Sequence, residues 1–138
     1  MTRGASQALA QGIAFLQAGK PRAASEAFET AIGLQPDAPD AHRALAALAM
    51  QHGGAERCLP VLARAARLAP GDGWAYRETG RVLCTLGRFA QAVAPFRQAV
   101  RLGKPDAALM FDLGVALQES GALPDAVAAY RVAQPRDD

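Results

Sequence analysis

The sequence predicts an all-α protein made of four helix-turn-helix units stacked in a row. Glycine recurs every 34 residues, at Gly19, Gly53, Gly87 and Gly121. A fixed period of this length is typical of repeats in which each unit packs only against its neighbours. Alanine, the strongest helix former, occurs 33 times in 138 residues. We therefore expect about eight helices, two in each repeat.

Other positions keep the same period, so the glycines are not a coincidence. A bulky column contains Phe28, Leu62, Phe96 and Tyr130. Two small columns contain Gly12, Ala46, Gly80 and Gly114, and Ala24, Cys58, Ala92 and Ala126. Small residues allow paired helices to approach closely, and the bulky residues are expected to fill the space between units. The repeats fall at about 5–38, 39–72, 73–106 and 107–138, so we expect a single domain, 1–138.

Each repeat is expected to contain two helices separated by its periodic glycine. In the first repeat, helical apolar spacing ends at 18–19, a second helix covers about 22–34, and Pro36 and Pro39 close the unit. The later pairs are expected at 40–52 and 56–68, 74–86 and 90–102, and 107–120 and 124–133. Each glycine is expected to be a left-handed cap, because it lacks a Cβ atom. Carboxylates that can cap first helices are Asp37, Asp40, Asp72 and Asp106.

Composition disfavours several classes of function. The net charge of +2, from 15 basic and 13 acidic residues, is too balanced for a surface driven by phosphate neutralisation, although a local patch is compatible with it. Residues 1–7 lack the apolar run of a signal peptide, and no stretch reaches the roughly 18 apolar residues of a membrane span. Two cysteines without an export signal favour a reducing cytoplasm. We therefore expect a cytoplasmic protein that binds neither nucleic acid nor membrane.

Catalytic and metal-binding patterns are weak. His42 and His52 are separated by about 15 Å of helical rise, too far to share a metal ion, and His42 is expected to be a packing residue. Cys58 falls in a small column and Cys84 near the expected groove, and neither belongs to a zinc-binding pattern. The sequence contains no P-loop, dinucleotide-binding turn, nucleophile elbow or HExxH motif. We expect no enzymatic activity, no cofactor and no metal.

The periodic residues resemble the tetratricopeptide-repeat (TPR) pattern over nearly the whole chain. The third repeat matches at Tyr76, Gly80, Leu83, Ala92, Phe96 and Ala99. The fourth matches at Leu113, Gly114, Leu117, Ala126, Tyr130 and Ala133, and the first at Gly12, Phe15, Ala24, Phe28, Ala31 and Pro36. The second repeat matches least well, with Ala46 and Cys58. The resemblance implies a right-handed α-solenoid that binds a partner peptide or helix in a concave groove lined by the first helices.

The resemblance also implies which residues line that groove. They are Leu9, Ile13 and Leu16; Arg43, Ala47 and Met50; Trp74, Arg77, Glu78, Arg81 and Cys84; and Phe111, Asp112, Val115 and Gln118. This lining is apolar at both ends and basic in the middle. Trp74 is either a groove anchor or a packing residue at the repeat junction.

Arg77 and Arg81 lie four residues apart on one helical face, and the planar guanidinium group binds carboxylates with two hydrogen bonds. The sharper hypothesis is therefore a peptide with an acidic residue flanked by apolar anchors. In the alternative, the arginines pair with Glu78, Asp112 and Asp40 and only solubilise the face.

The C-terminal end raises a further question, because the chain reaches residue 138 directly after the last helix. Repeat arrays normally need a polar capping element there. Three explanations stay open: self-association or partner binding, a helix made polar enough by Asp125 and Arg131, or a continuation in a longer protein. The expected function is a protein-interaction scaffold. The alternative is the N-terminal substrate-recognition module of a larger bacterial transferase of the glycosyl- or sulfotransferase type.

Overall fold

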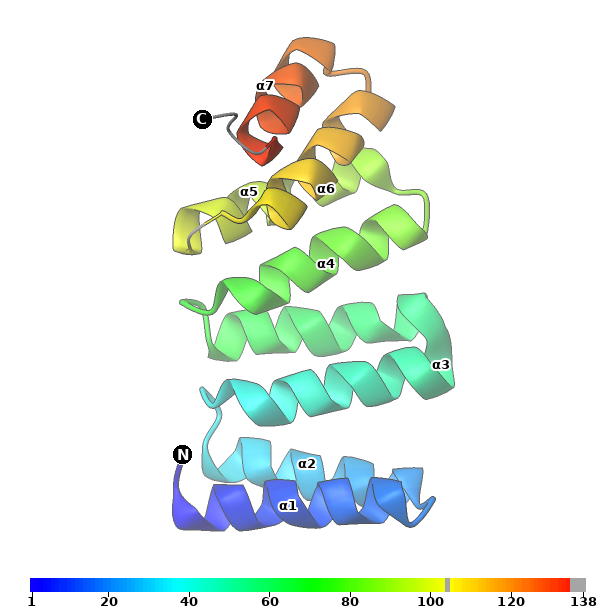
Figure 1. Cartoon of the computed structure of the whole chain (residues 1–138). Helices are drawn as coiled ribbons and strands as arrows, with labels where there is room; N and C mark the ends of the chain where they lie inside the picture. Colours follow the sequence, from blue (N-terminus) through cyan, green and yellow to red (C-terminus); the bar gives the residue numbers. More distant parts are fainter. Residues whose placement is uncertain (104, 135–138) are drawn as a thin grey trace. The chain divides into compact units, whose positions relative to one another are not determined.

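A computed structural model describes residues 1–103 and 105–134, and all secondary structure within them is helical (Figure 1). The chain forms two compact units, Met1–Pro70 and Gly71–Asp138. The first unit contains helices α1 (Arg3–Gln17), α2 (Pro21–Leu34) and α3 (Pro39–Leu68). The second contains α4 (Gly73–Thr85), α5 (Phe89–Leu102), α6 (Ala107–Glu119) and α7 (Leu123–Ala133). The all-α prediction is confirmed, and the helices begin and end within a few residues of the predicted positions.

In three repeats the turn after the first helix is closed by a left-handed glycine, as predicted. Gly19, Gly87 and Gly121 have φ angles of 74°, 75° and 87°. At the first turn, the Gly19 amide donates to the Leu16 carbonyl at 3.0 Å and the Lys20 amide donates to the Phe15 carbonyl at 2.8 Å. This pair of hydrogen bonds defines a Schellman motif, and it recurs at the other two glycines.

The second repeat turns differently. Gly54, and not Gly53, has the positive φ angle (79°, with ψ −178°), so the prediction for Gly53 is wrong. This backbone region is essentially restricted to glycine. The chain resumes its helix at once, and the two halves of α3, 39–53 and 55–68, run antiparallel (Figure 1). Gly53 has a different role, because a Cβ atom there would lie 2.5 Å from Cδ of Arg57. When α3 is counted as two segments, residues 1–103 and 105–134 contain eight helices, as expected.

The predicted carboxylate caps are present in the second unit only. Asp72 accepts a hydrogen bond from the Trp74 amide at 3.2 Å, and Asp106 accepts one from the Leu109 amide at 2.8 Å. The prediction is wrong for Asp37 and Asp40, because α3 begins at Pro39 and its N-cap is Ala38, with no side-chain cap. The helix starts one residue earlier than expected. Asp40 consequently lies within the first turn, where its charge still favours the helix dipole.

Glycines of the first helices lie directly against the bulky column, which confirms that small residues permit close approach. A Cβ atom at Gly80 would lie 2.5 Å from Cε1 of Phe96, and one at Gly114 would lie 2.5 Å from Cε1 of Tyr130. The second repeat carries Ala46 and Leu62 at the corresponding positions, both buried. Leu62 is smaller than Phe96 or Tyr130, and Ala46 is larger than glycine. The combined volume of the two side chains is therefore similar in these repeats.

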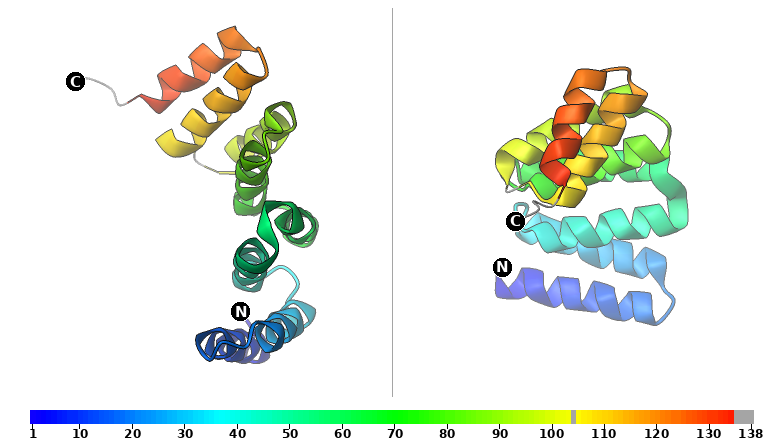
Figure 2. Two further views of the ribbon diagram at one scale, coloured as in Figure 1. Left: turned by 90° about the vertical axis from the view of Figure 1, so that its right-hand side faces the viewer. Right: turned by 45° about the horizontal axis from the view of Figure 1, so that its top comes forward.

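Each unit has its own packing. In the first, a buried cluster joins α1 and α2 to the beginning of α3 through Ala8, Ala24, Phe28, Ala31, Ile32, Ala41, Leu45 and Leu48. His42 is 1% exposed, and its Nε2 atom lies 2.7 Å from the Pro36 carbonyl oxygen, in keeping with the expected packing role. In the second unit, α4 packs against α5, α5 against α6, and α6 against α7 (Figure 2).

Candidate partner-binding groove

In the first unit, the predicted groove residues divide into exposed and supporting positions. Ile13 and Met50 are 45% and 41% exposed, and Arg43 and Ala47 are also exposed. Leu9 and Leu16 are half-buried and pack against the buried cluster described above. The exposed apolar side chains are available for contact, whereas Leu9 and Leu16 also stabilise the helix pair.

In the second unit, the structure brings five predicted residues together. A hollow of about 310 Å³ between α4 and α6 is lined by Arg81, Cys84, Thr85, Phe96, Phe111, Asp112 and Val115. The residues of this hollow that were expected in the groove are Arg81, Cys84, Phe111, Asp112 and Val115. Trp74 is half-buried in the first turn of α4 and does not line this hollow.

Arg77 is engaged within the protein. Its guanidinium donates two hydrogen bonds to the Asp106 carboxylate, at 2.8 and 3.2 Å. These bonds raise the pKa of Arg77 and lower the pKa of Asp106. Because Asp106 also caps α6, the ion pair connects α4 to the start of α6. Arg77 pairs as the alternative hypothesis expected, although with Asp106 instead of the predicted carboxylates.

Arg81 is more available than Arg77. Its guanidinium lies 3.4 Å from the Glu78 carboxylate, and 57% of its side chain is exposed. Exposed ion pairs three residues apart on a helix contribute little, so a ligand carboxylate can compete with Glu78. The hollow also carries a negative charge, because Asp112 lines it. Burial raises the pKa of the Cys84 thiol, and the charge of Asp112 raises it further.

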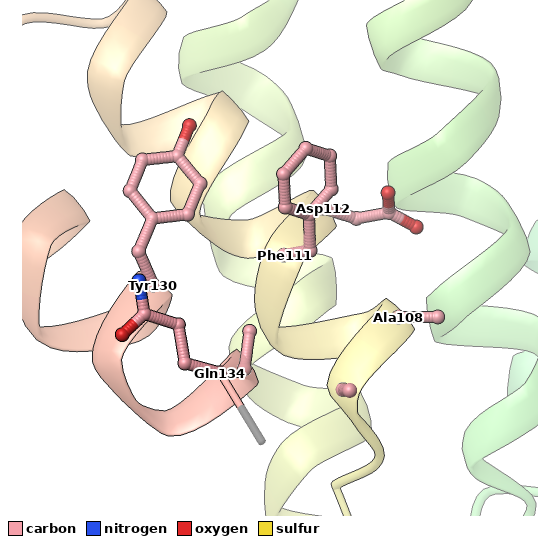
Figure 3. Close-up of a pocket in the computed structure, with 7 residues that line it drawn as sticks. Ala108, Phe111, Asp112, Tyr130 and Gln134 are labelled. Atoms are coloured by element: carbon pink, nitrogen blue, oxygen red, sulfur yellow. The ribbon is translucent and has the colours of Figure 1, made fainter. Parts of the chain in front are cut away.

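A second hollow, of about 690 Å³, lies at the C-terminal end of the described chain. It is lined by Ala107, Ala108, Phe111, Asp112, Tyr130, Ala133 and Gln134. The Phe111 and Tyr130 rings are 5.6 Å apart and tilted by 48°, and the Asp112 carboxylate points away from them (Figure 3). Phe111 is 55% exposed. The tail that the sequence argument considered, residues 135–138, lies outside the described residues.

The third repeat shows how the residue that corresponds to Tyr130 is covered when another helix follows. Phe96 is the counterpart of Tyr130, and it is fully buried, whereas Tyr130 is only half-buried. The difference arises because α6 packs against α5, whereas no described helix follows α7. The hydroxyl of Tyr130 instead donates to Oε1 of Gln118 at 2.7 Å.

Several lining residues were not among the predicted groove residues: Thr85 and Phe96 of the hollow between α4 and α6, and Ala107, Ala108, Tyr130, Ala133 and Gln134 of the C-terminal hollow. Thr85 follows Arg81 by four residues, so helical spacing alone places both on one face. Tyr130 was assigned to the bulky column, and its exposure depends on the absence of a covering helix within the described residues.

Among residues 1–103 and 105–134, no group of His, Cys, Asp or Glu is arranged to hold a metal ion. No helix in the same part of the chain is both long and apolar enough to cross a membrane.

Paired antiparallel helices with glycine turns define a helical-repeat protein. The family is shown by sequence: residues 9–73 and 77–138 match the tetratricopeptide-repeat model. The chain therefore belongs to the TPR family, whose members serve in general as protein-interaction scaffolds.

Solved structures of MamA share the fold. The structure described as MamA MSR-1 C2 is 23% identical, with a TM-score of 0.69 over 94% of this chain and 74% of that chain. Another, described as Crystal structure of MamA, is 19% identical, with a TM-score of 0.75 over 94% and 75%. The MamA RS-1 ArsTM double mutant is 20% identical, with a TM-score of 0.73 over 96% and 75%. At these identities the likeness concerns the fold alone. Among curated proteins, no significant sequence match was found.

Proposed function

We propose that the protein is a scaffold without catalysis of its own, which binds a peptide or helix of a partner protein on the first-helix side of its repeats. The main support is the hollow between α4 and α6, where Arg81, Phe111, Asp112 and Val115 converge. In the first unit, the exposed side chains of Ile13 and Met50 are proposed to provide apolar ligand contacts. The remaining predicted groove residues belong to the same proposal.

The ligand is proposed to carry one acidic residue flanked by apolar anchors. Arg81 is the residue proposed to bind the carboxylate, because Arg77 is already paired with Asp106. Phe111 and Val115 supply the apolar contacts. Asp112 lines the same hollow, and its charge would repel a second carboxylate placed nearby. A single acidic residue is therefore favoured over an acidic run at this site.

Selection from a peptide library by the wild type and by Arg81→Glu tests this proposal. The matched control is Arg101→Glu, which makes the same charge change at an exposed site on α5 outside the hollow. We expect Arg81→Glu to lose the preference for an acidic residue while the control keeps it. Unchanged selectivity in Arg81→Glu would contradict the acidic-ligand proposal.

Self-association through the C-terminal end is proposed as well, supported by the open hollow beside Phe111 and Tyr130. A head-to-tail stack is disfavoured. In the first unit, Leu45 of α3 packs into the preceding repeat, and its counterpart on α1 is the exposed Gln11. Two C-terminal ends are thus better matched to each other than to an N-terminal end.

Light scattering across a concentration series tests self-association. Ala108 lines only the C-terminal hollow, so Ala108→Glu is expected to abolish a dimer while leaving the α4/α6 hollow intact. Ala94→Glu, at an exposed position on α5, is the control. A wild type that stays monomeric at the highest concentration would reject this proposal.

Two further expectations remain proposals. The four repeats are proposed to act as one domain, which coincident unfolding transitions by circular dichroism and Trp74 fluorescence would support. The recognition module of a larger bacterial transferase is the alternative function, and it would use the same groove. A catalytic domain encoded in the same reading frame would favour that alternative.

A further inference from the structure

A third hollow, in the first unit, lies on the side formed by the second helices, away from the proposed groove residues. It has a volume of about 880 Å³, between α2 and both halves of α3. Leu45 and Leu48 are buried and form an apolar floor. The rim contains Arg22 and Glu29 of α2, and Arg57, Arg64 and Arg67 of α3.

The rim is strongly basic. Four arginines and His52 line the hollow, and Glu29 is the one acidic residue among the lining residues. Glu29 pairs with Arg64 at 2.9 Å. Within residues 1–103 and 105–134, Arg22, Arg57 and Arg67 have no ion pair. The stem of Arg57 lies against Gly53, where the lack of a Cβ atom makes room for it. Three positive charges are therefore left available around an apolar floor.

The second unit provides an internal control for this site. A hollow at the same repeat positions, two periods further along the chain, has a volume of only about 260 Å³. There the counterparts of Glu29 and Arg57 are Arg97 and Asp125, which face each other at 3.5 Å. The counterparts of Arg22 and Arg64 are Ala90 and Val132. The basic rim and the larger volume are thus specific to the first unit and are not imposed by the repeat fold.

We propose that this hollow binds an acidic peptide segment that inserts an apolar side chain between α2 and α3. This second docking site is independent of the proposed first-helix groove. Arg57 and Arg67 are separated by about 15 Å of rise along α3, and Arg22 lies on α2, so the three available arginines match carboxylates repeated along a peptide. Guanidinium groups bind such carboxylates with two parallel hydrogen bonds.

The lining favours a peptide over a nucleic acid. It contains no Phe, Tyr or Trp on which bases can stack. Glu29 on the rim would repel a continuous phosphate backbone, whereas a peptide can place a neutral or basic residue opposite it. The buried Leu45 and Leu48 offer an apolar contact that phosphates and sugars do not use.

Fluorescence anisotropy with a labelled peptide that repeats Glu and Leu at helical spacing tests the inference. We expect saturable binding that weakens with added salt. A peptide with Gln in place of Glu, and a polyglutamate without Leu, should each bind at least about tenfold more weakly, since charge and apolar contact both contribute. Oligothymidylate is the polyanion control. If it binds as tightly as the peptide and competes with it, the inference is wrong and the site is a nucleic-acid site.

Two variants locate the peptide. Arg57→Glu/Arg67→Glu should weaken binding about tenfold or more, whereas Arg97→Glu/Arg101→Glu, with the same charge change in the second unit, should not. Ala49→Leu introduces the residue of the smaller hollow, Leu117, and should weaken binding without changing charge. Circular dichroism confirms that each variant is folded. Unchanged binding in both first-unit variants, or loss only in Arg81→Glu, would overturn the inference.

Discussion

The contact between Gly80 and Phe96 gives a quantitative test of how the helix pairs pack. In Gly80→Ala, the new Cβ atom would lie 2.5 to 2.7 Å from three atoms of the Phe96 ring. Carbon atoms prefer separations of about 3.5–4.0 Å, so the ring or the helix must shift by about 1 Å. Phe96 is fully buried, so a shift of its ring disturbs the side chains packed around it.

Two opposing effects determine the magnitude. Replacing glycine by alanine within a helix stabilises by about 1 kcal/mol. Overpacking a buried site costs about 1–3 kcal/mol, and three close contacts with one ring place this site at the upper end. The expected net change is a loss of about 2 kcal/mol in the free energy of unfolding. Phe96→Leu alone should cost about 1–2 kcal/mol, through lost burial and a small cavity.

The second repeat already combines alanine with leucine at these positions, Ala46 with Leu62. Gly80→Ala/Phe96→Leu should therefore be more stable than the sum of the single changes, by about 1–2 kcal/mol. Urea unfolding followed by circular dichroism measures this coupling. Gly33→Ala is the matched control, because nothing lies within 4 Å of its Cβ position, and it should be neutral or stabilising. Equal stability of Gly80→Ala and Gly33→Ala, or additive single changes, would refute the reasoning.

Three other predictions concern the turn, the ion pair and the thiol. Gly54→Ala and Gly54→Asn should both lower the free energy of unfolding by about 1–3 kcal/mol, since asparagine does not tolerate this backbone region either; a thermal melt of each variant is sufficient. The pKa of Asp106 is lowered by Arg77, so its ion pair stabilises the fold above pH of about 4, and this contribution is lost as the pH falls through the lowered value. Asn caps helices well, so Asp106→Asn isolates the ion pair, and its stability deficit should be constant at neutral pH and shrink in acid. The raised pKa of Cys84 should make its alkylation slower at neutral pH than that of an unfolded thiol, and Asp112→Asn should accelerate it, as measured by a pH–rate profile in a Cys58→Ala background.

Adjacent glycines show where sequence reasoning reached its limit. The 34-residue period selected Gly53 as the turn, but Gly54 adopts the positive φ angle. A period cannot distinguish two neighbouring glycines, because both lack a Cβ atom and can adopt a positive φ angle. The structure shows that Gly53 lies against the Arg57 stem, a contact that the period does not predict. The misplaced caps at Asp37 and Asp40 have a similar origin, since a helix start one residue earlier changes which side chain can reach the free amides.

Local patterns in the sequence determined the helix pairs, most of their turns and the close contacts between small and bulky columns. These features depend on backbone preferences and on contacts between the two helices of one repeat. Both the preferences and the contacts recur every 34 residues. Only the tertiary structure decided which charges are available to a partner. Arg77 is paired with Asp106, 29 residues away, whereas Arg22, Arg57 and Arg67 surround an apolar hollow between α2 and α3. Whether a surface charge is paired depends on side chains contributed by separate helices, and the periodic pattern within one repeat contains no information about that pairing.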